Sequence, residues 1–277
     1  NEPNCAVASN PAAPCDDSIS GTYDRWLPRV GVRYAFAPGA DLFANWSGSF
    51  EAPSLSEAGN AFAGELLANR AQRGQTLEVG SRGSAQVGGY NVGWDVAVYR
   101  AALRNELLQL TLPNGASATV NADATIHQGI ETGWRISRGD WQWSGAATLQ
   151  DFRFDSDRRY RDNTLAGLPD AFATSELRWN GPNGLYIAPA VQAATRTWVD
   201  MANILKAPGY AIVNLRVGQR QPDGWGWFIE GRNLLDKVYS ATTGVIRDAT
   251  APGASPAQFL PGDGIAVYAG LEYRPKP

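Results

Sequence analysis

The chain has one histidine, His127, in the segment "TIHQGIETGW". Sites with several histidines, such as a His-rich metal site, cannot be assembled from it. A Ser-His-Asp triad could form only around this residue. If the segment is a strand, two-residue alternation places His127 on one face with Glu131 and Arg135, which favours hydrogen bonding among polar neighbours over catalysis. We expect no catalytic residue and no enzyme activity.

The segment "DFRFDSDRRYRD" is the densest cluster of charge in the chain. Its acidic residues are interleaved with arginines, at a spacing that does not match a calcium-binding loop. We therefore expect solvated loop charge, with no metal and no cofactor. The basic side chains could attract an anionic chelate through their field alone. The acidic residues are Asp151, Asp155, Asp157 and Asp162, and the basic ones are Arg153, Arg158, Arg159 and Arg161.

The two cysteines, Cys5 and Cys15, are close together in a segment rich in Pro, Ala and Asp. This spacing fits a local disulfide formed in an oxidising compartment better than a metal site. We expect the bridge in an extracellular loop, with two free thiols as the alternative.

Composition excludes several classes of protein. The net charge of the 277 residues is -3, so there is no basic excess that would indicate nucleic-acid binding. There is no apolar run long enough for a transmembrane helix, of about 18 residues. The opening "NEPNCAVASN" lacks the basic and apolar regions of a signal peptide.

Apolar and polar residues alternate along almost the whole chain, and a helical period is found only between residues 54 and 70. The sequence therefore predicts an all-β protein. In "YAIVNLRVGQR", for example, Val213 and Leu215 share one face, and Asn214 and Arg216 share the other. Charged residues in mid-strand would be rejected by the core of a β-sandwich and accepted by a water-filled barrel lumen. We expect Val213 and Leu215 to face lipid.

Short and long connections alternate between about eleven expected strands. The short ones, such as "APGAD" and "SRGD", are rich in turn-forming residues. Short turns at one end and long loops at the other are typical of outer-membrane barrels, whereas a Greek-key sandwich has no reason for this order. The expected strands are residues 22–37, 41–51, 73–83, 89–111, 118–137, 140–155, 170–180, 184–199, 209–220, 225–232 and 263–274.

Aromatic residues concentrate at the short-turn ends of these strands, as in an interfacial girdle. The alternative is that aromatic residues simply favour strands. The residues are Tyr34, Phe36, Trp141, Trp143, Trp179, Trp225, Trp227 and Tyr273.

Several segments resemble TonB-dependent outer-membrane receptors, in the order in which that family carries them. "FIEGRNLLDKVY" is similar to the family signature in the next-to-last strand, here with Asn233, Leu234, Asp236 and Tyr239. Five further matches are "SGSFEAPSLSE", "LEVGSRG", "VNADATIHQGIETGW", "NTLAGLPDAFATSELRW" and "FLPGDGIAVYAGLEYR". Each is weak alone, and together they cover nearly the whole chain.

The resemblance implies a fold and a place within a larger protein. It implies an antiparallel transmembrane β-barrel, of which residues 1–277 supply about eleven strands out of about 22. The N-terminal plug, the TonB box and the first half of the barrel would precede Asn1. The closing strand of the family ends in an aromatic residue that assists assembly. Here we expect Tyr273, with Gly270, to serve, unless the native end differs from "YRPKP".

The resemblance also implies a function. A monomeric barrel in the bacterial outer membrane would bind a scarce ligand, with ferric siderophores as the default class, and import it with energy delivered by TonB through the N-terminal part. The expected partners are TonB, outer-membrane lipid and a small-molecule or chelate ligand. A passive porin is the alternative, followed by a soluble β-sandwich binding protein. The sequence does not identify the ligand or the loop residues that bind it.

Overall fold

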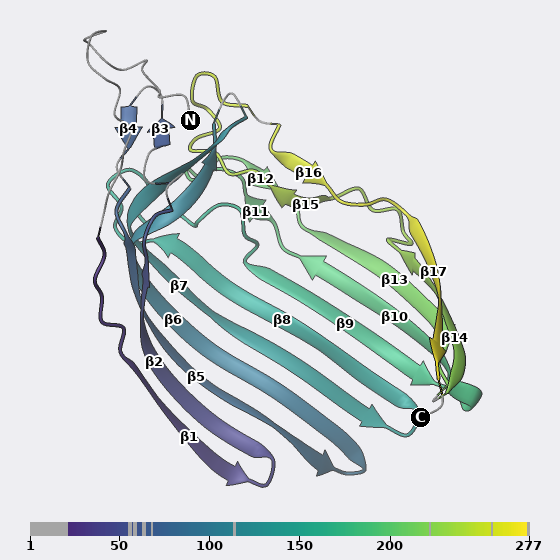
Figure 1. Cartoon of the computed structure of the whole chain (residues 1–277). Coiled ribbons are helices and arrows are strands. Elements are labelled where there is room, and N and C mark those ends of the chain that lie inside the picture. The colour runs from purple at the N-terminus through teal and green to yellow at the C-terminus, as the bar shows by residue number, and fades with distance from the viewer. Residues whose placement is uncertain are drawn as a thin grey trace.

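The computed structural model describes residues 22–54, 57, 60–62, 65–67, 69–112, 115–221, 223–255 and 257–275. Its main feature is one antiparallel sheet of eleven strands (Figure 1). No helix in these described ranges is long and apolar enough to cross a membrane. The strands of the sheet are β1 (Arg29–Ala37), β2 (Ala40–Glu51), β5 (Gln72–Val87), β6 (Tyr90–Thr111), β7 (Ser117–Arg138), β8 (Trp141–Phe154), β9 (Ala171–Asn180), β10 (Leu185–Ala194), β13 (Tyr210–Gln219), β14 (Gly224–Arg232) and β17 (Ala266–Arg274).

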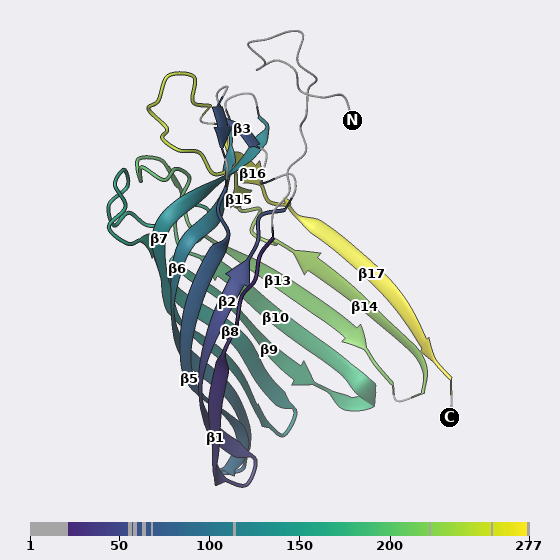
Figure 2. The same cartoon turned by 60° about the vertical axis from the view of Figure 1, so that its left-hand side comes forward.

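The sheet is an up-and-down meander, because each strand pairs with the strands that precede and follow it in the order β1-β2-β5-β6-β7-β8-β9-β10-β13-β14-β17. Among the described residues, β1 and β17 are each paired on one side only, so the sheet is open. Figure 2 shows that it is curved. The predicted all-β class and the eleven strands are confirmed.

Two strand predictions need correction, and so does the reading of the helical period. The first strand begins at Arg29 and not near residue 22, because Pro28 has no backbone N–H to donate to a ladder. Strand β10 ends at Ala194 and not at residue 199, and Val199 is fully buried among the loops. The helical period between residues 54 and 70 is misleading, since Asn60–Phe62 (β3) and Glu65–Leu67 (β4) form an antiparallel pair there.

The register gives the sheet two chemically different faces. Val191 is opposite Val213, and Arg216 is opposite Glu230, so paired positions match in polarity. We call the two surfaces the apolar face and the polar face. The apolar face includes Val32, Ala44, Val79, Val96, Val98, Ile130, Ala147, Leu149, Val191, Val213, Leu215, Ile229, Val267 and Leu271. The polar face includes Arg33, Asn45, Glu78, Asp95, Glu131, Arg135, Glu176, Asn214, Arg216, Glu230 and Glu272.

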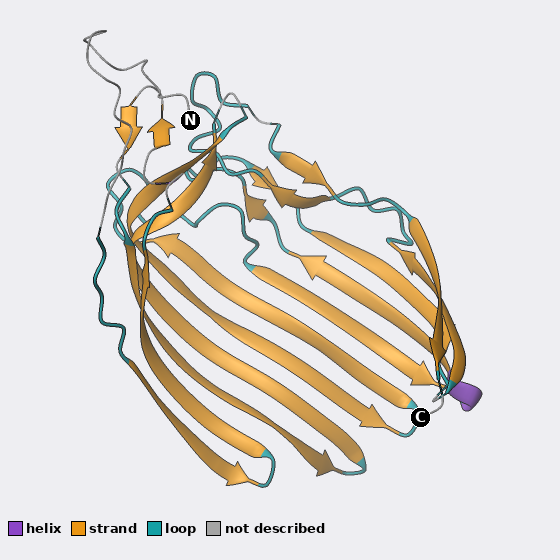
Figure 3. Cartoon of the chain, viewed as in Figure 1, coloured by secondary structure: helices purple, strands orange, loops and turns teal. Residues whose placement is uncertain are grey.

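The predicted alternation of short and long connections is confirmed. The β5–β6 turn has Gly88 and Gly89 at φ values of 57° and 81°, a conformation that favours glycine. The long connections gather at the opposite end of the sheet (Figure 3). Two small pairs of strands form within them: β11 (Thr197–Trp198) with β12 (Lys206–Ala207), and β15 (Ser240–Thr243) with β16 (Phe259–Pro261).

Large aromatic side chains lie on the apolar face at the short-turn end. Trp141 is directly opposite Trp179, and the rings of Trp225 and Tyr273 are 5.1 Å apart. Trp141, Trp225 and Tyr273 are all exposed. This placement is the one that an interfacial girdle requires.

Candidate functional site

The long connections form a loop layer, which we define as residues 112, 115–116, 155–170, 195–209, 233–255 and 257–265. The side chain of Asp200 is completely buried and connects two of these loops, those after β10 and β14. Its Oδ1 accepts hydrogen bonds from the backbone N–H groups of Ile204 (2.9 Å) and Leu205 (2.8 Å), and its Oδ2 accepts one from Ala249 (3.2 Å). A buried carboxylate is tolerated only when it is bonded in this way.

Backbone hydrogen bonds strengthen the same junction. The N–H of Met201 donates to the carbonyl of Ile246 (3.0 Å), and the N–H of Ile246 donates to the carbonyl of Val199 (3.1 Å). Asn203 connects to the loop after β8, because its Oδ1 accepts from Thr164 N–H (2.8 Å) and its Nδ2 donates to the Thr164 carbonyl (2.9 Å). The loops after β8, β10 and β14 are therefore held in one arrangement.

An apolar cluster underlies these polar connections. It consists of Leu110, Ala122, Phe154, Leu165, Ala166 and Met201. The ring of Tyr160 stacks on Phe154 with 4.9 Å between centroids. Burial of these side chains anchors the loops to the ends of β6, β7 and β8.

Two cavities adjoin the cluster, with volumes of about 260 Å³ and 220 Å³. Both are lined by Leu110, Arg159 and Arg247, so the two arginines lie at their common boundary. Asp157 positions one of them, because its Oδ1 accepts hydrogen bonds from the backbone N–H groups of Arg159 and Tyr160, each at 2.8 Å. We take this pair of cavities as the candidate ligand site.

The electrostatics of the site favour an anion. Burial lowers the pKa of Arg247, and the nearby charge of Arg159 lowers it further, while Tyr160 acts in the opposite direction. Burial also raises the pKa of Tyr160. Arg247 is thus partly shielded from water and lies near the exposed Arg159. Asp123, Asp157 and Asp248 also line the cavities, so the two arginines form the cationic part of the site, where an anionic ligand would be attracted.

His127 lies on the polar face, as predicted, and its main partner was not foreseen. Its Nε2 is 3.2 Å from Oε2 of Glu106, which also accepts a hydrogen bond from the Thr125 hydroxyl. The His127 ring stacks on Phe152 at 4.2 Å. Glu106 follows Asn105, whose φ of 52° is a local backbone feature that alternation cannot reveal.

The charged segment from Asp151 to Asp162, expected to be solvated loop charge, is divided between the end of β8 and the loop that follows it. Asp157 and Asp162 accept backbone hydrogen bonds within their own loop, and Asp151 lies on the apolar face beside Arg153. Within the ranges that the structure describes, there is no group of three or more potential metal ligands.

The family motif lies at the end of β14. Asn233, which is 1% exposed with φ 48°, donates from Nδ2 to the carbonyls of Lys237 (3.0 Å) and Asp263 (2.9 Å). Its Oδ1 accepts from Lys237 N–H (2.9 Å), and its own N–H donates to Oδ1 of Asn214 (2.9 Å).

The other motif residues continue this structure. Leu234 donates its N–H to the Val213 carbonyl, and Asp236 donates its N–H to the Asn233 carbonyl. The Tyr239 ring packs 4.4 Å from that of Tyr210. The motif therefore fastens the longest loop to β13.

The predicted assembly-signal residues lie in the last strand of the sheet. Tyr273 and Gly270 are in β17, where Gly270 is directly opposite Phe228. A Cβ at Gly270 would come within 2.3 Å of the Phe228 ring, so only glycine fits without displacement. Cys5 and Cys15 lie outside the described residues, and their pairing stays a prediction.

The sequence and the fold both match known receptors. The model of the family "TonB dependent receptor-like, beta-barrel" matches residues 6–234. The ferric yersiniabactin uptake receptor FyuA from Yersinia pestis aligns with a TM-score of 0.68 at 15% identity, covering 88% of this chain and 36% of that one. The siderophore receptor PiuA from Acinetobacter baumannii gives 0.65 at 18% identity, covering 88% and 35%.

A third match is the ferric enterobactin receptor PfeA from Pseudomonas aeruginosa, in complex with enterobactin. It gives a TM-score of 0.66 at 18% identity, covering 90% of this chain and 40% of that one. The chain thus spans between a third and two fifths of the length of these solved receptors. At such identities the structures show a common fold, and the family model, matching most of the sequence, shows that the chain belongs to the TonB-dependent receptor-like β-barrel family.

Proposed function

We propose that these residues form the C-terminal portion of an outer-membrane receptor for a scarce ligand. The rest of the barrel, of about 22 strands in all, and an N-terminal plug would be supplied by sequence preceding Asn1. Two observations support this: the open edges of β1 and β17, and alignments that cover 35–40% of the matched receptors. In lipid, each unpaired backbone N–H or C=O at a strand edge costs on the order of several kcal/mol. The open sheet therefore needs further strands that pair with β1 and β17.

From the two faces and the two ends we infer an orientation in the membrane. The apolar face contacts lipid, and the polar face borders the lumen and the plug. The short turns point to the periplasm and the loop layer points outward, as is usual for bacterial barrels. The aromatic residues at the short-turn end, among them Trp141 and Trp225, lie at the inner boundary.

The observation that carries the ligand proposal is the pair of cavities at Arg159 and Arg247. The partly buried Arg247 and the exposed Arg159, at the outer end of the molecule, suit an anionic chelate, and ferric siderophores are the default class. Two of the matched structures are described as ferric yersiniabactin and ferric enterobactin receptors, which agrees with this class.

Transport would be driven by TonB, which would act on the plug. A passive porin remains the second candidate because the chain's polar wall would also suit an aqueous channel. The two differ in their energy requirement. Dissipating the proton gradient with a protonophore should abolish uptake by a TonB-driven receptor and leave a porin unaffected.

The ligand site can be tested in the complete receptor by titrating purified protein with a trianionic ferric tris-catecholate and following tryptophan fluorescence. We expect Arg159→Gln to weaken binding by about tenfold, the loss of one charge-assisted contact. Arg161→Gln, in the same loop and outside the cavity lining, is the matched control and should bind normally. An uncharged ferric hydroxamate should be insensitive to both changes. Equal binding of the catecholate by all three proteins would refute the proposed site.

We also propose that Gly270 and Tyr273 of β17 belong to the signal read during barrel assembly. The support is that Tyr273 is an exposed aromatic residue on the apolar face near the chain's last described residue. Tyr273→Ala should reduce the amount of folded receptor in the membrane, measured by heat-modifiable migration in gels, while Tyr90→Ala in the β5–β6 hairpin should not.

A further inference from the structure

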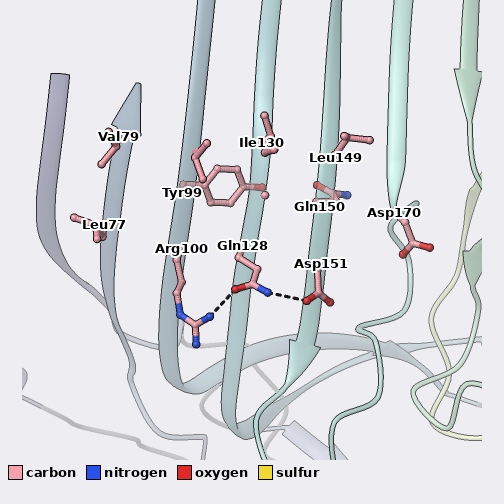
Figure 4. A pocket seen from close by; sticks show the side chains of 12 residues that line it. Leu77, Val79, Tyr99, Arg100, Gln128, Ile130, Leu149, Gln150, Asp151 and Asp170 are labelled. Carbon is pink, nitrogen blue, oxygen red and sulfur yellow. Dashed lines mark hydrogen bonds between the residues drawn. The ribbon is translucent and has the colours of Figure 1, made fainter. Parts of the chain in front are cut away.

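A groove on the apolar face lies outside the loop layer and is not used by the proposed ligand site. It has a volume of about 630 Å³ and crosses β5, β6, β7 and β8 (Figure 4). One part of its lining is apolar and exposed: Leu77, Val79, Val98, Ile130 and Leu149. The other part is polar and includes Arg100, Gln128 and Asp151.

The polar part is a connected chain of side chains. Arg100 Nη1 donates to Gln128 Oε1 (2.6 Å), and Gln128 Nε2 donates to Asp151 Oδ2 (2.9 Å), as Figure 4 shows. Arg153 Nε lies 3.4 Å from the same carboxylate oxygen. These contacts hold Arg100 in a fixed position at one end of the groove.

Two further arginines extend this end toward the loops. Arg73 of β5 and Arg104 of β6 are direct cross-strand partners, and both are exposed on the apolar face. Like charges directly opposite each other destabilise a sheet unless an anion lies between them. Among the described residues, neither forms an ion pair with a carboxylate. Four arginines here face two carboxylates, those of Asp151 and Asp170.

The position of this basic end matches a membrane boundary. The segment of β8 from Trp141 to Asp151 spans about 33 Å along the strand, at about 3.3 Å per residue. At a tilt of about 40° this corresponds to about 25 Å along the barrel axis, the usual height of the apolar band. The tryptophans therefore mark one boundary of the band, and the arginines mark the other.

We propose that the groove binds a phosphorylated lipid of the outer leaflet. Its acyl chain lies along Leu77, Val98 and Ile130, and its phosphate contacts Arg73, Arg100 and Arg104. The proposal rests on the membrane orientation proposed above, and it adds a lipid site on the outside of the barrel. Charge complementarity at one end and apolar lining at the other select an anionic lipid over a free anion or a second protein chain.

The test uses the complete receptor, stripped of lipid in detergent and examined by native mass spectrometry with dioleoyl phosphatidic acid and dioleoyl phosphatidylcholine. We expect retention of the phosphatidic acid to exceed that of the phosphatidylcholine by about tenfold. The variant Arg73→Gln/Arg104→Gln should lose this preference. Arg29→Gln/Arg135→Gln, which removes two arginines from the polar face, should keep it.

The apolar part has its own test. Val98→Phe fills the groove with an apolar side chain that lipid tolerates, so the barrel should still fold, and it should lower retention of both lipids. Folding of every variant is checked by heat-modifiable migration.

Three outcomes would overturn the lipid site: unchanged lipid preference in Arg73→Gln/Arg104→Gln, equal loss in the polar-face control, or competition by inorganic phosphate as strong as by lipid. If the wild type formed a dimer without lipid and Arg73→Gln/Arg104→Gln did not, the groove would instead be a contact between two copies of the chain. A protein that never enters the membrane fraction would instead reject the membrane orientation itself, so the two failures are distinguishable.

Discussion

The two ends of the sheet are built by different means. At the short-turn end, neighbouring strands are joined by tight turns such as Gly88–Gly89. The positive φ values of this turn require nothing more than glycine at these two positions. At the loop end, chain segments far apart in sequence are joined by buried polar side chains, with Asp200 and Asn233 as the main examples. The turn end depends on local residue choice, and the loop end depends on distant partners.

This difference separates an end that fixes the strands from an end that can hold a ligand. Tight turns fix strand register and leave little room for a ligand, whereas long loops can enclose cavities. The cavities at Arg159 and Arg247 are held by contacts between loops, so a change at one buried polar residue should reach the ligand site without disturbing the strands.

The largest effect is expected between the two ends, in the middle of β8. Ala147 lies on the apolar face and Thr148, beside it, lies on the polar face opposite Glu131. Ala147→Arg should destabilise the complete receptor by about 2–4 kcal/mol, the cost of an arginine at the bilayer midplane. Thr148→Arg should be nearly neutral. Urea unfolding in lipid measures both, and equal losses would show that the two faces are not as different as the register indicates.

The next prediction compares the ends directly, through two asparagines with similar backbones. Asn233 at the loop end has φ 48°, and Asn183 in the β9–β10 turn has φ 56°. Asn233→Ala should cost about 2–3 kcal/mol, because buried partners such as the Asp263 carbonyl lose their hydrogen bonds. Asn183→Ala should cost only about 1 kcal/mol, because alanine is disfavoured at a positive φ. Hydrogen exchange at residues 233–239 and 181–185 reports each site. Similar costs would mean that the buried side-chain bonds contribute nothing.

A smaller effect is expected where strands must approach closely. Gly270→Ala brings a Cβ against the Phe228 ring, which lies under the guanidinium of Arg216 at 4.0 Å. We expect a loss of about 1–2 kcal/mol from overpacking. Gly133→Ala is the control, since its added Cβ meets nothing closer than 4.0 Å. If the two variants unfold at the same urea concentration, the close approach has no energetic consequence.

The smallest effect concerns pH at the loop end. Burial raises the pKa of Tyr160 above its ordinary value of about 10. The neutral phenol therefore contributes stability that is complete below about pH 10 and is lost as pH rises through the higher folded pKa. The phenolate absorbance of the wild type minus that of Tyr160→Phe should titrate above pH 10. A midpoint at or below that value would contradict the buried position.

Residue alternation and turn composition were enough to predict the eleven strands, the antiparallel order and the two faces. These features follow from the alternation of side chains with a period of two residues and from the backbone conformations that tight turns require. Both depend only on residues that are close together in the sequence. The family motif at Asn233 could also be found from residue types alone. Its role, fastening the longest loop through contacts with Asp263 and Asn214, could not.

Only the tertiary structure brought together Arg159 and Arg247, which are separated by about a third of the sequence and meet across two loops. It also paired Arg73 with Arg104 and placed Glu106 beside His127. The face on which a strand residue lies is set by the alternation of adjacent residues in the sequence. The sites depend on which distant segments pack together and on single backbone departures such as Asn105, and no sequence period encodes either.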